Sequence, residues 1–459
     1  MSHASRWIRL LPAIATMLFA PAVSAEVKTL HEEAIPYKGD ALPERTRPLL
    51  EIGPAMLGTG PLDPGFELPT GAVWQPALWV FGQYRTGAGI YKNGGGSEEQ
   101  EWANRLDLFA NLRLSGTERV LLGLSPLRDE GKFSGYHRRP ADKEGFDSAF
   151  SGEITTLFFE GEIGEIFPDA DPFDTGGLDI GFTVGRQQLL FQEGLLINDT
   201  IDAVAVTRDT LIARDISVDT RVTGLFGWGN IHRSDNQRDD RTRLVGLFSE
   251  TDFQDTTVAL DAIWVTGSED GGDGTDGLFL GGAATQRFGK LNTAFRLAHS
   301  VAFDESSAAV DTGTVLLAEL SGDPMGNDDV LYVNGAWAID RFTSAARDPL
   351  AGGPLVPVGI LFASPNLGDY GAALSNRAED VVAAATGYQM FFNQERTQLV
   401  AEIGTRIATD PDQRDAVAIG LRFQQAIGAR LILQLDGFVS REEARDTGYG
   451  ARSELLVRF

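Results

Sequence analysis

Apolar and polar residues alternate along several segments of this chain. The clearest is "RLDLFANLRLSG", where one parity carries Leu106, Leu108, Ala110, Leu112 and Leu114 and the other carries Arg105, Asp107, Asn111 and Arg113. Because successive side chains of a β-strand point to opposite faces, this pattern predicts a strand with one apolar and one polar face. The same alternation recurs in residues 330–340, 398–407, 416–425, 430–438 and 453–459.

Weaker segments of similar length supply the remaining predicted strands. They lie near residues 76–88, 117–125, 153–163, 178–190, 200–212, 219–229, 241–250, 256–267, 276–287, 290–302, 313–320 and 380–393. The total is about 18 strands, in a range of about 14 to 18, and each has the roughly 9 to 11 residues that a tilted transmembrane strand requires. No comparable run has helical spacing, so the sequence predicts an all-β fold.

The predicted strands are joined by short turns, such as "FGKLN" and "DPDQRD", and by long polar loops. The long connections are residues 125–148, 267–277 and 342–380. Short periplasmic turns and long extracellular loops are typical of an outer-membrane barrel. We therefore predict a transmembrane antiparallel β-barrel over residues 74–459. The 342–380 stretch could fold inward as a gate or lie outside as a surface loop, and we expect a surface loop.

The N-terminus indicates export, and the C-terminal strand favours the membrane barrel over a soluble sandwich, propeller or β-helix, whose strands also alternate. Residues 1–25 have a basic start, an apolar centre and a small-residue cleavage site, which predicts a secretory signal peptide. Residues 26–73 are polar and are expected to form a periplasmic extension or plug. The last strand ends on Phe459, on its apolar parity, and a closed barrel pairs its last strand with its first.

An aromatic C-terminus is also similar to the signal that the barrel-assembly machinery recognises. The predicted location is therefore the outer membrane of a Gram-negative bacterium, with Phe459 as the assembly signal and with outer-membrane lipid and lipopolysaccharide around the wall.

The composition and the motifs of the chain exclude several classes of function. The net charge of -26 disfavours nucleic-acid binding, and the absence of cysteine excludes disulfides and a lipoprotein anchor. The five histidines are scattered, with no H-E-x-x-H motif, and there is no G-x-S-x-G motif. The acidic "EDGGDGTDG" lacks the glutamate that completes an EF-hand loop, so a solvated loop is the simpler interpretation. We expect no enzyme, no cofactor and no metal site.

Arginines dominate the parity that we assign to the lumen. An arginine on the lipid face costs a few kcal/mol at mid-membrane, so the lumen is the cheaper location. The predicted channel-lining residues are Arg105, Arg113, Arg186, Arg208, Arg221, Arg296, Arg406, Arg422, Asp107, Asp202, Glu402 and Asp436. The arginines either form ion pairs with acids on neighbouring strands and have only a structural role in the wall, or they attract carboxylates and phosphates of a solute. Their surplus over the acids favours passage of anions.

The stretch from Thr155 to Leu211 contains "TVGRQQ" and, on the following strand, "NDTIDA". It resembles the alginate-export family of outer-membrane barrels. That resemblance implies a monomeric barrel of about 18 strands whose arginine-rich lumen passes an anionic polysaccharide. It also implies that Arg186 is a lumen arginine within the family's Gly-Arg-Gln motif and that Asp202 is its acidic partner.

The sequence thus predicts an outer-membrane channel for anionic solutes or an anionic polysaccharide. Two alternatives remain open. One is a general diffusion porin in which arginine and acid ladders face each other with weak selectivity. The other is a barrel that serves as a surface adhesin or scaffold through its acidic loops.

Overall fold

The computed structural model describes residues 46–56, 64–129, 131–172, 176–213, 216–267, 275–303, 307–324, 326 and 328–459. The predicted signal peptide lies outside the described residues, as does most of the predicted extension over residues 26–73. None of the described helices has the length and the apolar character that a membrane span requires.

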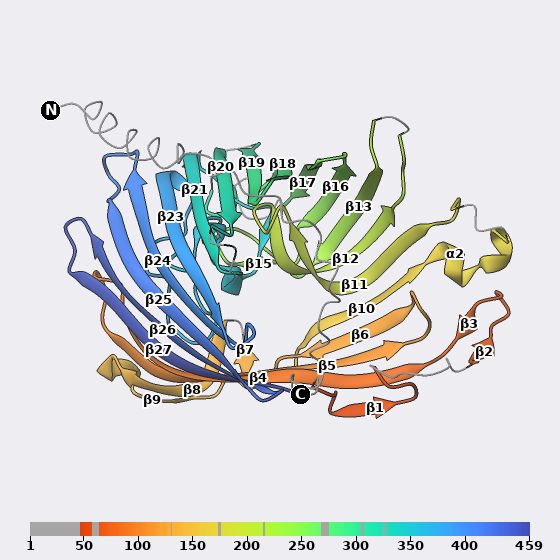
Figure 1. Cartoon of the computed structure of the whole chain (residues 1–459), viewed down its shortest axis with the longest axis horizontal. Coiled ribbons are helices and arrows are strands. Elements are labelled where there is room, and N and C mark those ends of the chain that lie inside the picture. Colours follow the sequence, from red (N-terminus) through yellow and green to blue (C-terminus); the bar gives the residue numbers. More distant parts are fainter. Residues whose placement is uncertain are drawn as a thin grey trace. The chain divides into compact units, whose positions relative to one another are not determined.

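Eighteen antiparallel strands form a closed ring (Figure 1), which confirms the predicted fold class and strand count. They are β4 (Ala77–Lys92), β5 (Glu99–Arg113), β6 (Arg119–Leu124), β10 (Ile154–Glu162), β11 (Ile180–Phe191), β12 (Ile197–Arg208), β13 (Asp219–Gly229), β16 (Arg243–Asp252), β17 (Thr256–Thr266), β18 (Gly277–Phe288), β19 (Leu291–Ala302), β20 (Gly313–Gly322), β21 (Val330–Arg341), β23 (Glu379–Phe392), β24 (Thr397–Ala408), β25 (Ala416–Ile427), β26 (Leu431–Glu442) and β27 (Thr447–Arg458). The ring closes because β27 pairs with β4 from Tyr449 opposite Lys92 to Arg458 opposite Gln83.

The remaining elements lie at the strand ends or in the connections. They are β1 (Leu50–Ile52), β2 (Phe66–Glu67), β3 (Val73–Trp74), β7 (Arg128–Asp129), β8 (Lys132–Arg139), β9 (Gly145–Asp147), β14 (Ile231–His232), β15 (Arg238–Asp239), β22 (Ala346–Arg347), the helix α2 (Ile163–Ile166) and the 3₁₀ turns Ala141–Lys143, Pro168–Ala170, Pro349–Ala351 and Val356–Val358. β1 pairs with β4 at Leu50 opposite Val80, beyond the end of β27.

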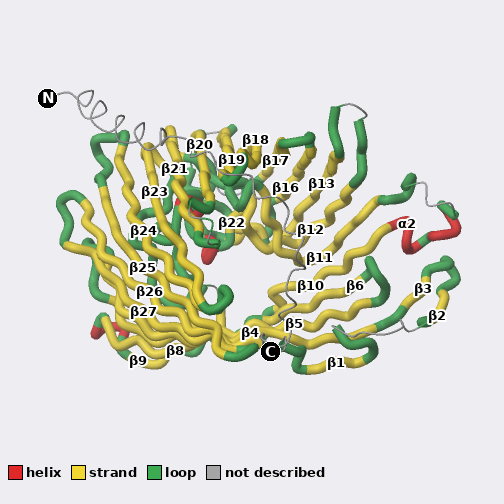
Figure 2. The backbone as a smooth tube through the Cα atoms, in the orientation of Figure 1, coloured by secondary structure: helices red, strands yellow, loops and turns green. Residues whose placement is uncertain are grey.

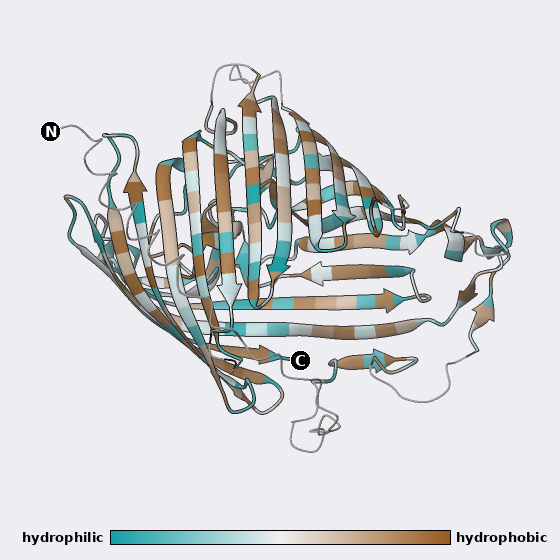
Figure 3. Ribbon diagram, turned by 45° about the horizontal axis from the view of Figure 1, so that its top comes forward, coloured by the Kyte–Doolittle hydropathy of each residue, from teal (hydrophilic) through white to brown (hydrophobic). Residues whose placement is uncertain are grey.

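The outward faces of the strands are apolar, and tryptophans gather near one end of the wall. Leu260, Ile419 and Leu421 are each more than half exposed on this face, and Figure 3 shows the alternation of apolar and polar positions along the strands. Four tryptophans stand on outward parities near the strand ends that adjoin the long connections: Trp102, Trp228, Trp264 and Trp337. Such aromatic residues mark the level of the lipid headgroups. Because long loops are typical of the extracellular side of such barrels, we assign this end to the cell exterior.

The short turns lie at the opposite, periplasmic end, after β16, β18, β23 and β25. The "DPDQRD" turn is an exception, because it joins β24 to β25 at the extracellular end.

Two segments leave the wall and fold into the lumen. The first, which we call the hairpin tip, is residues 187–201 at the end of β11 and the start of β12. The second, the lumen loop, is residues 342–378 between β21 and β23. Figure 2 shows loop segments and short helical turns enclosed by the strands. The expectation that residues 342–380 form an external surface loop is therefore wrong.

Backbone hydrogen bonds join the lumen loop to the hairpin tip. The Ala345 N–H donates to the carbonyl of Leu196 at 2.9 Å, and β22 pairs in parallel with β12 at Ile197 opposite Ala346. The buried Arg347 side chain also donates to the carbonyl of Gly194. The two segments thus form one body inside the barrel.

An apolar core holds this body against the wall. It contains Leu196, Ile201, Leu355, Leu361 and Phe362 from the two segments, all nearly inaccessible. The wall contributes inward side chains of β13 to β25, including Ile263, Phe279, Val315, Ala338 and Val381. Much of the extracellular half of the lumen is consequently filled by packed side chains, and the polar surfaces lie beside this core.

Candidate functional site

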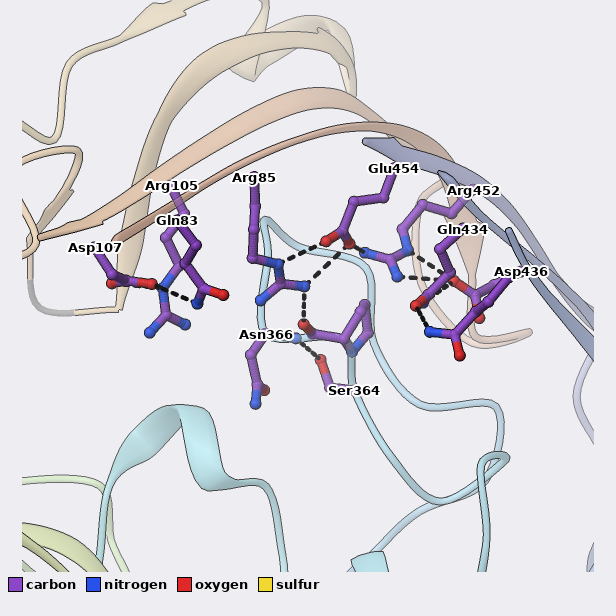
Figure 4. Close-up of polar contacts among 12 residues, drawn as sticks. Gln83, Arg85, Arg105, Asp107, Ser364, Asn366, Gln434, Asp436, Arg452 and Glu454 are labelled. Carbon is purple, nitrogen blue, oxygen red and sulfur yellow. Dashed lines mark hydrogen bonds and ion pairs between the residues drawn. The ribbon is translucent and has the colours of Figure 1, made fainter. Parts of the chain in front are cut away.

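A ladder of arginines and acids crosses the inner wall from β25 to β5 (Figure 4). Arg422 Nε lies 2.7 Å from Asp436 Oδ1, and the other oxygen of Asp436 accepts from Arg452 Nη2 at 2.7 Å. Arg452 also binds Glu454, whose carboxylate accepts from Arg85 Nε at 2.6 Å. The acids therefore bridge successive arginines on neighbouring strands.

The ladder continues on β5, where Arg105 Nε lies 2.9 Å from Asp107 Oδ2. Asp107 also accepts from Gln83 Nε2 at 3.0 Å and from Ser125 Oγ at 2.7 Å. These hydrogen bonds fully occupy the carboxylate. Four arginines thus stand against three acids in the ladder.

The acids of the ladder and its central Arg452 are buried, whereas the arginines at the two ends are more exposed. The side chains of Asp107, Glu454 and Asp436 are only 3%, 4% and 11% exposed, whereas those of Arg105 and Arg422 are 20% and 25% exposed. Among the described residues, no hydrogen-bond partner occupies the Nη atoms of Arg105 or Arg422. The ladder therefore presents free guanidinium donors to the lumen while its carboxylates lie beneath them.

The lumen loop covers the middle of the ladder. Arg85 Nη2 donates to the carbonyl of Pro365 at 2.8 Å, and the ring of Tyr370 lies 5.7 Å from the Arg452 guanidinium. Arg105 and Arg422 are on either side of this contact, as Figure 4 shows for Arg105 and for Asp436, the partner of Arg422. The two arginines with free donors are therefore those that make no hydrogen bond to the lumen loop.

Arg422 also lines a cavity of about 360 Å³ between the lumen loop and the wall. Amide side chains surround it, from Asn334, Gln389, Gln398 and Gln424, and Val356 and Ile360 of the loop supply an apolar side. A cavity with one guanidinium and several amides suits a small anion that also carries hydroxyl groups.

A second cavity, of about 340 Å³, lies against β13 to β19 and has a different charge balance. Its lining includes two arginines, Arg221 and Arg296, and three acids, Glu193, Glu250 and Asp261. Arg221 pairs with Asp209 at 2.6 Å, and Arg296 pairs with Glu319. The ladder therefore has more arginines than acids, whereas this cavity has more acids than arginines.

Other predicted lumen residues hold the structure together. The Glu402 carboxylate accepts the backbone N–H groups of Ile360 and Leu361 at 2.9 and 2.8 Å, which fixes the lumen loop to β24. Arg406 is buried and donates to Gln413 at 3.1 Å. Arg113 lies at the periplasmic end of β5, where it donates to the Ser115 carbonyl at 2.7 Å.

The predicted lumen positions of Arg186, Asp202 and Arg208 are wrong. The inward parity of β11 and β12 carries the buried Gln187, Leu189 and Ile201. The opposite parity carries Val184 and Val206, which are 42% and 47% exposed, together with Arg186, Asp202 and Arg208.

Hydrogen bonds to nearby acids and carbonyl groups, rather than contact with a wet lumen, reduce the cost of placing Arg186, Asp202 and Arg208 on this face. The Arg186 guanidinium binds Asp202 through Nε at 2.8 Å and Nη2 at 2.9 Å and reaches Glu153, where the hairpin tip leaves the wall. Arg208 donates to the carbonyl of Asp179 at the periplasmic end.

Three ladder residues were not among the predicted site residues: Arg85, Arg452 and Glu454. Arg452 and Glu454 share one parity of the terminal strand, so that alternation could have indicated both. Arg85 lies in a weak segment in which Gly82 interrupts the apolar parity, and Gly87 and Gly89 lie on the parity of Arg85 itself.

Two groups of acidic and histidine side chains have the spacing of possible metal ligands. Their ligand atoms lie within 4.8 Å of one another in Asp199, His232 and Asp348, and in Glu101, His137 and Asp369. In the first group, the fully buried Asp199 accepts from the His232 backbone N–H at 2.7 Å and lies 2.9 Å from its Nδ1. We call this group the His232 junction, because it joins β14, the hairpin tip and the lumen loop.

The environment of His232 favours its charged form. Burial by itself would lower the pKa of the imidazole, but the hydrogen bond to Asp199 and the charges of Asp199 and Asp348 outweigh it and raise the pKa above its ordinary value.

Phe459 lies on the outward parity at the periplasmic end. Its backbone exchanges two hydrogen bonds with Gly82, at 2.8 and 3.1 Å, and its ring lies over the same glycine. Phe459 is thus paired within the wall.

No protein-family profile matches the chain, and no curated protein matches it in sequence. Solved structures do match it. A BenF-like porin from Pseudomonas fluorescens has a TM-score of 0.55 at 10% identity, over 83% of this chain and 98% of that one. OpdK from Pseudomonas aeruginosa, solved with vanillate, has a TM-score of 0.54 at 12% identity, over 83% and 98%.

A third similar structure is Wzi from Escherichia coli, a carbohydrate-binding β-barrel involved in capsule assembly. Its TM-score is 0.50 at 10% identity, over 82% of this chain and 84% of that one. These neighbours do not single out the alginate-export family. Together with the closed ring and its apolar outer face, they show that the chain has the fold of a Gram-negative outer-membrane channel barrel.

Proposed function

We propose that the protein is a passive outer-membrane channel for small anionic solutes, with no catalytic step. The observation that carries this proposal is the exposure of the arginines at the two ends of the ladder, Arg105 and Arg422, above buried carboxylates. The carboxylates are covered by their arginines, so that a solute in the lumen meets the free Nη atoms of Arg105 and Arg422.

The free donors of Arg105 and Arg422 would act as two weak anion sites along one wall. Guanidinium groups bind carboxylates and phosphates through paired hydrogen bonds, and several weak sites let a solute enter and leave again. Vanillate, with which the similar barrel OpdK was solved, is a carboxylate of suitable size.

Cavity size favours a small solute over a polymer. The cavity beside Arg422 measures about 360 Å³, and the lumen loop and hairpin tip fill much of the remaining space. An anionic polysaccharide, as the alginate-export resemblance implies, would require the lumen loop to move.

A general diffusion porin with weak selectivity is the second candidate. The cavity against β13 to β19, with its two arginines and three acids, favours it, because opposed charges set a transverse field without excluding either ion. An adhesin or scaffold barrel is the third. The apolar core inside the lumen favours that candidate, because a filled barrel need not conduct.

Single-channel recording in a planar bilayer with a salt gradient separates these candidates. The refolded wild type should give a reversal potential that favours chloride, and the Arg105→Ala/Arg422→Ala variant should bring it close to zero. Arg430→Ala, in an exposed periplasmic turn, is the matched control and should leave the potential unchanged.

Current block by vanillate and by oligouronates would then compare small and polymeric anions. A wild-type preference for cations would overturn the anion assignment, a reversal potential near zero would support the diffusion porin, and an absence of conductance would support the scaffold.

A further inference from the structure

The barrel wall branches at β5. Its periplasmic half pairs with β6, from Leu108 opposite Leu124 to Arg113 opposite Arg119. Its extracellular half pairs instead with β8, which in turn pairs with β9. Among the described residues, β9 has no further partner, so β8 and β9 form a short extension of the sheet with a free edge (Figure 1).

The two faces of this extension have different surroundings. On the inward face, Phe133 of β8 and Ala103 of β5 pack against Leu367 of the lumen loop. The opposite parity of β5 continues into Leu106, Leu108 and the exposed Leu112. The outward face of β8 and β9 is therefore continuous with the apolar surface that contacts lipid.

Three aromatic rings form a row across this outward face. Trp102 of β5 lies opposite Tyr136 of β8, and Tyr136 lies opposite Phe146 of β9. The Tyr136 and Phe146 rings are 4.7 Å apart in an edge-to-face arrangement. Phe146 is 79% exposed, and Phe150, in the connection that follows, is 74% exposed. Aromatic rings left this bare within a folded chain indicate contact with another molecule.

Basic residues stand directly beyond the row, at the top of β8. The register of β5 and β8 shifts between Gln100 and Glu101, which places Arg138 and Arg139 together at the rim. Arg138 is exposed and has no ion-pair partner among the described residues. The Arg139 side chain remains 58% exposed although it binds Glu98 at 2.9 Å. The row thus has an apolar side toward the membrane. Toward the exterior it has Arg138 and Arg139 together with Glu98 and Glu144, and Glu144 accepts from the Tyr136 hydroxyl at 3.3 Å.

We propose that this surface, defined by Trp102, Tyr136, Arg138, Arg139 and Phe146 and here called the β8–β9 face, binds one lipopolysaccharide molecule of the outer leaflet. The aromatic row would lie against the acyl chains and the sugar that carries them, and the two arginines would bind the phosphates. The location selects this occupant, because the face continues the lipid-facing wall at its extracellular end. A soluble saccharide or a protein would not need that continuity.

The test measures binding of purified rough lipopolysaccharide to the folded full-length barrel, delipidated in detergent, by native mass spectrometry. The wild type should retain one lipopolysaccharide molecule and should bind phosphatidylglycerol at least tenfold more weakly. Phe146→Ser combined with Arg138→Glu should weaken lipopolysaccharide binding at least tenfold. Arg138→Glu alone changes only an exposed side chain, so it keeps the test valid if the double variant fails to fold.

Phe288→Ser combined with Arg430→Glu is the matched control, because it makes the same changes at exposed residues of the periplasmic end. Its lipopolysaccharide affinity should equal that of the wild type. Equal affinity of the wild type and Arg138→Glu would overturn the proposal. So would equal wild-type affinity for lipopolysaccharide and phosphatidylglycerol, which would indicate only a general attraction of anionic lipid.

Discussion

Arg85 holds both carboxylate oxygens of Glu454, at 2.6 Å from Nε and 3.0 Å from Nη2. Because β4 is the first strand of the ring and β27 is the last, this ion pair joins the two ends of the barrel on the lumen side. The same guanidinium donates to the carbonyl of Pro365. A single side chain therefore connects closure of the wall with the position of the lumen loop.

Replacing Arg85 with alanine should weaken both connections. Glu454 keeps Arg452 as a partner, so we expect a loss of about 1.5–3 kcal/mol in the free energy of unfolding, the range for a hydrogen bond to a charged group. The measurement is reversible urea unfolding in lipid vesicles, together with the open probability of single channels, which should rise. Arg445→Ala, in an extracellular turn, is the control. An unchanged open probability would show that Pro365 is held without Arg85.

The His232 junction should make the lumen body sensitive to pH. The folded-state pKa of the His232 imidazole lies above the ordinary value of about 6.5. The stabilisation that the protonated imidazole gives to the fold is therefore complete below that value and is lost as the pH rises through the folded-state pKa. The charges that face the imidazole are Asp199, Asp348 and Arg238, and Arg238 opposes protonation.

We therefore expect current fluctuations and protease cleavage within residues 342–378 to increase as the pH is raised above neutrality. His232→Asn should remove this dependence, whereas His299→Asn, which alters a histidine hydrogen-bonded to Thr314, should retain it. The same pH response in both variants would exclude the junction as its source.

A charge placed in the apolar core should loosen the lumen loop. Phe362 is fully buried in that core, so in Phe362→Asp the carboxylate would lack a partner and the loop would detach from β24 and β25. Single-channel conductance should increase and become noisier. Ile212→Asp, at an exposed position in a periplasmic connection, should have wild-type conductance. A lower conductance in Phe362→Asp would mean that the lumen loop supports the open state.

Arg186 provides a test of the assignment of faces. Because it lies on the parity opposite to Gln187 and pairs with Asp202, Arg186→Ala should leave the reversal potential unchanged and lower the temperature of unfolding. Arg422→Ala should shift the reversal potential. A shift of similar size in Arg186→Ala would contradict the outward assignment and would indicate that Arg186 faces the lumen.

The sequence predicted the wall well where one parity was clearly apolar. In β5 and in β24 to β27, leucine, isoleucine and valine mark the lipid face, so Arg105, Arg422 and Asp436 could be placed in the lumen. In β11 and β12, apolar residues occupy both parities, because the hairpin tip buries one face in the internal core. The cost of an arginine in lipid then misled the assignment of Arg186, since that cost disappears when the side chain is paired near the membrane boundary.

The position of the lumen loop could have been inferred from its composition. It carries Leu355, Ile360, Leu361 and Phe362, more apolar surface than an exposed loop normally has. Contacts such as that between Glu402 and the loop backbone were beyond prediction, because they join residues about forty positions apart through a loop without periodicity.

The strands between β17 and β23 contact apolar material on both sides, with lipid outside and the internal core inside. Emptying the barrel would therefore hydrate a surface of alanine, valine and phenylalanine, at a cost of about 25 cal/mol for each Å² exposed. Expulsion of the whole internal body is consequently far more costly than a small displacement near Pro365. The same constraint applies during biogenesis, because a ring that closed before the inner segments had entered would expose this apolar inner surface to water.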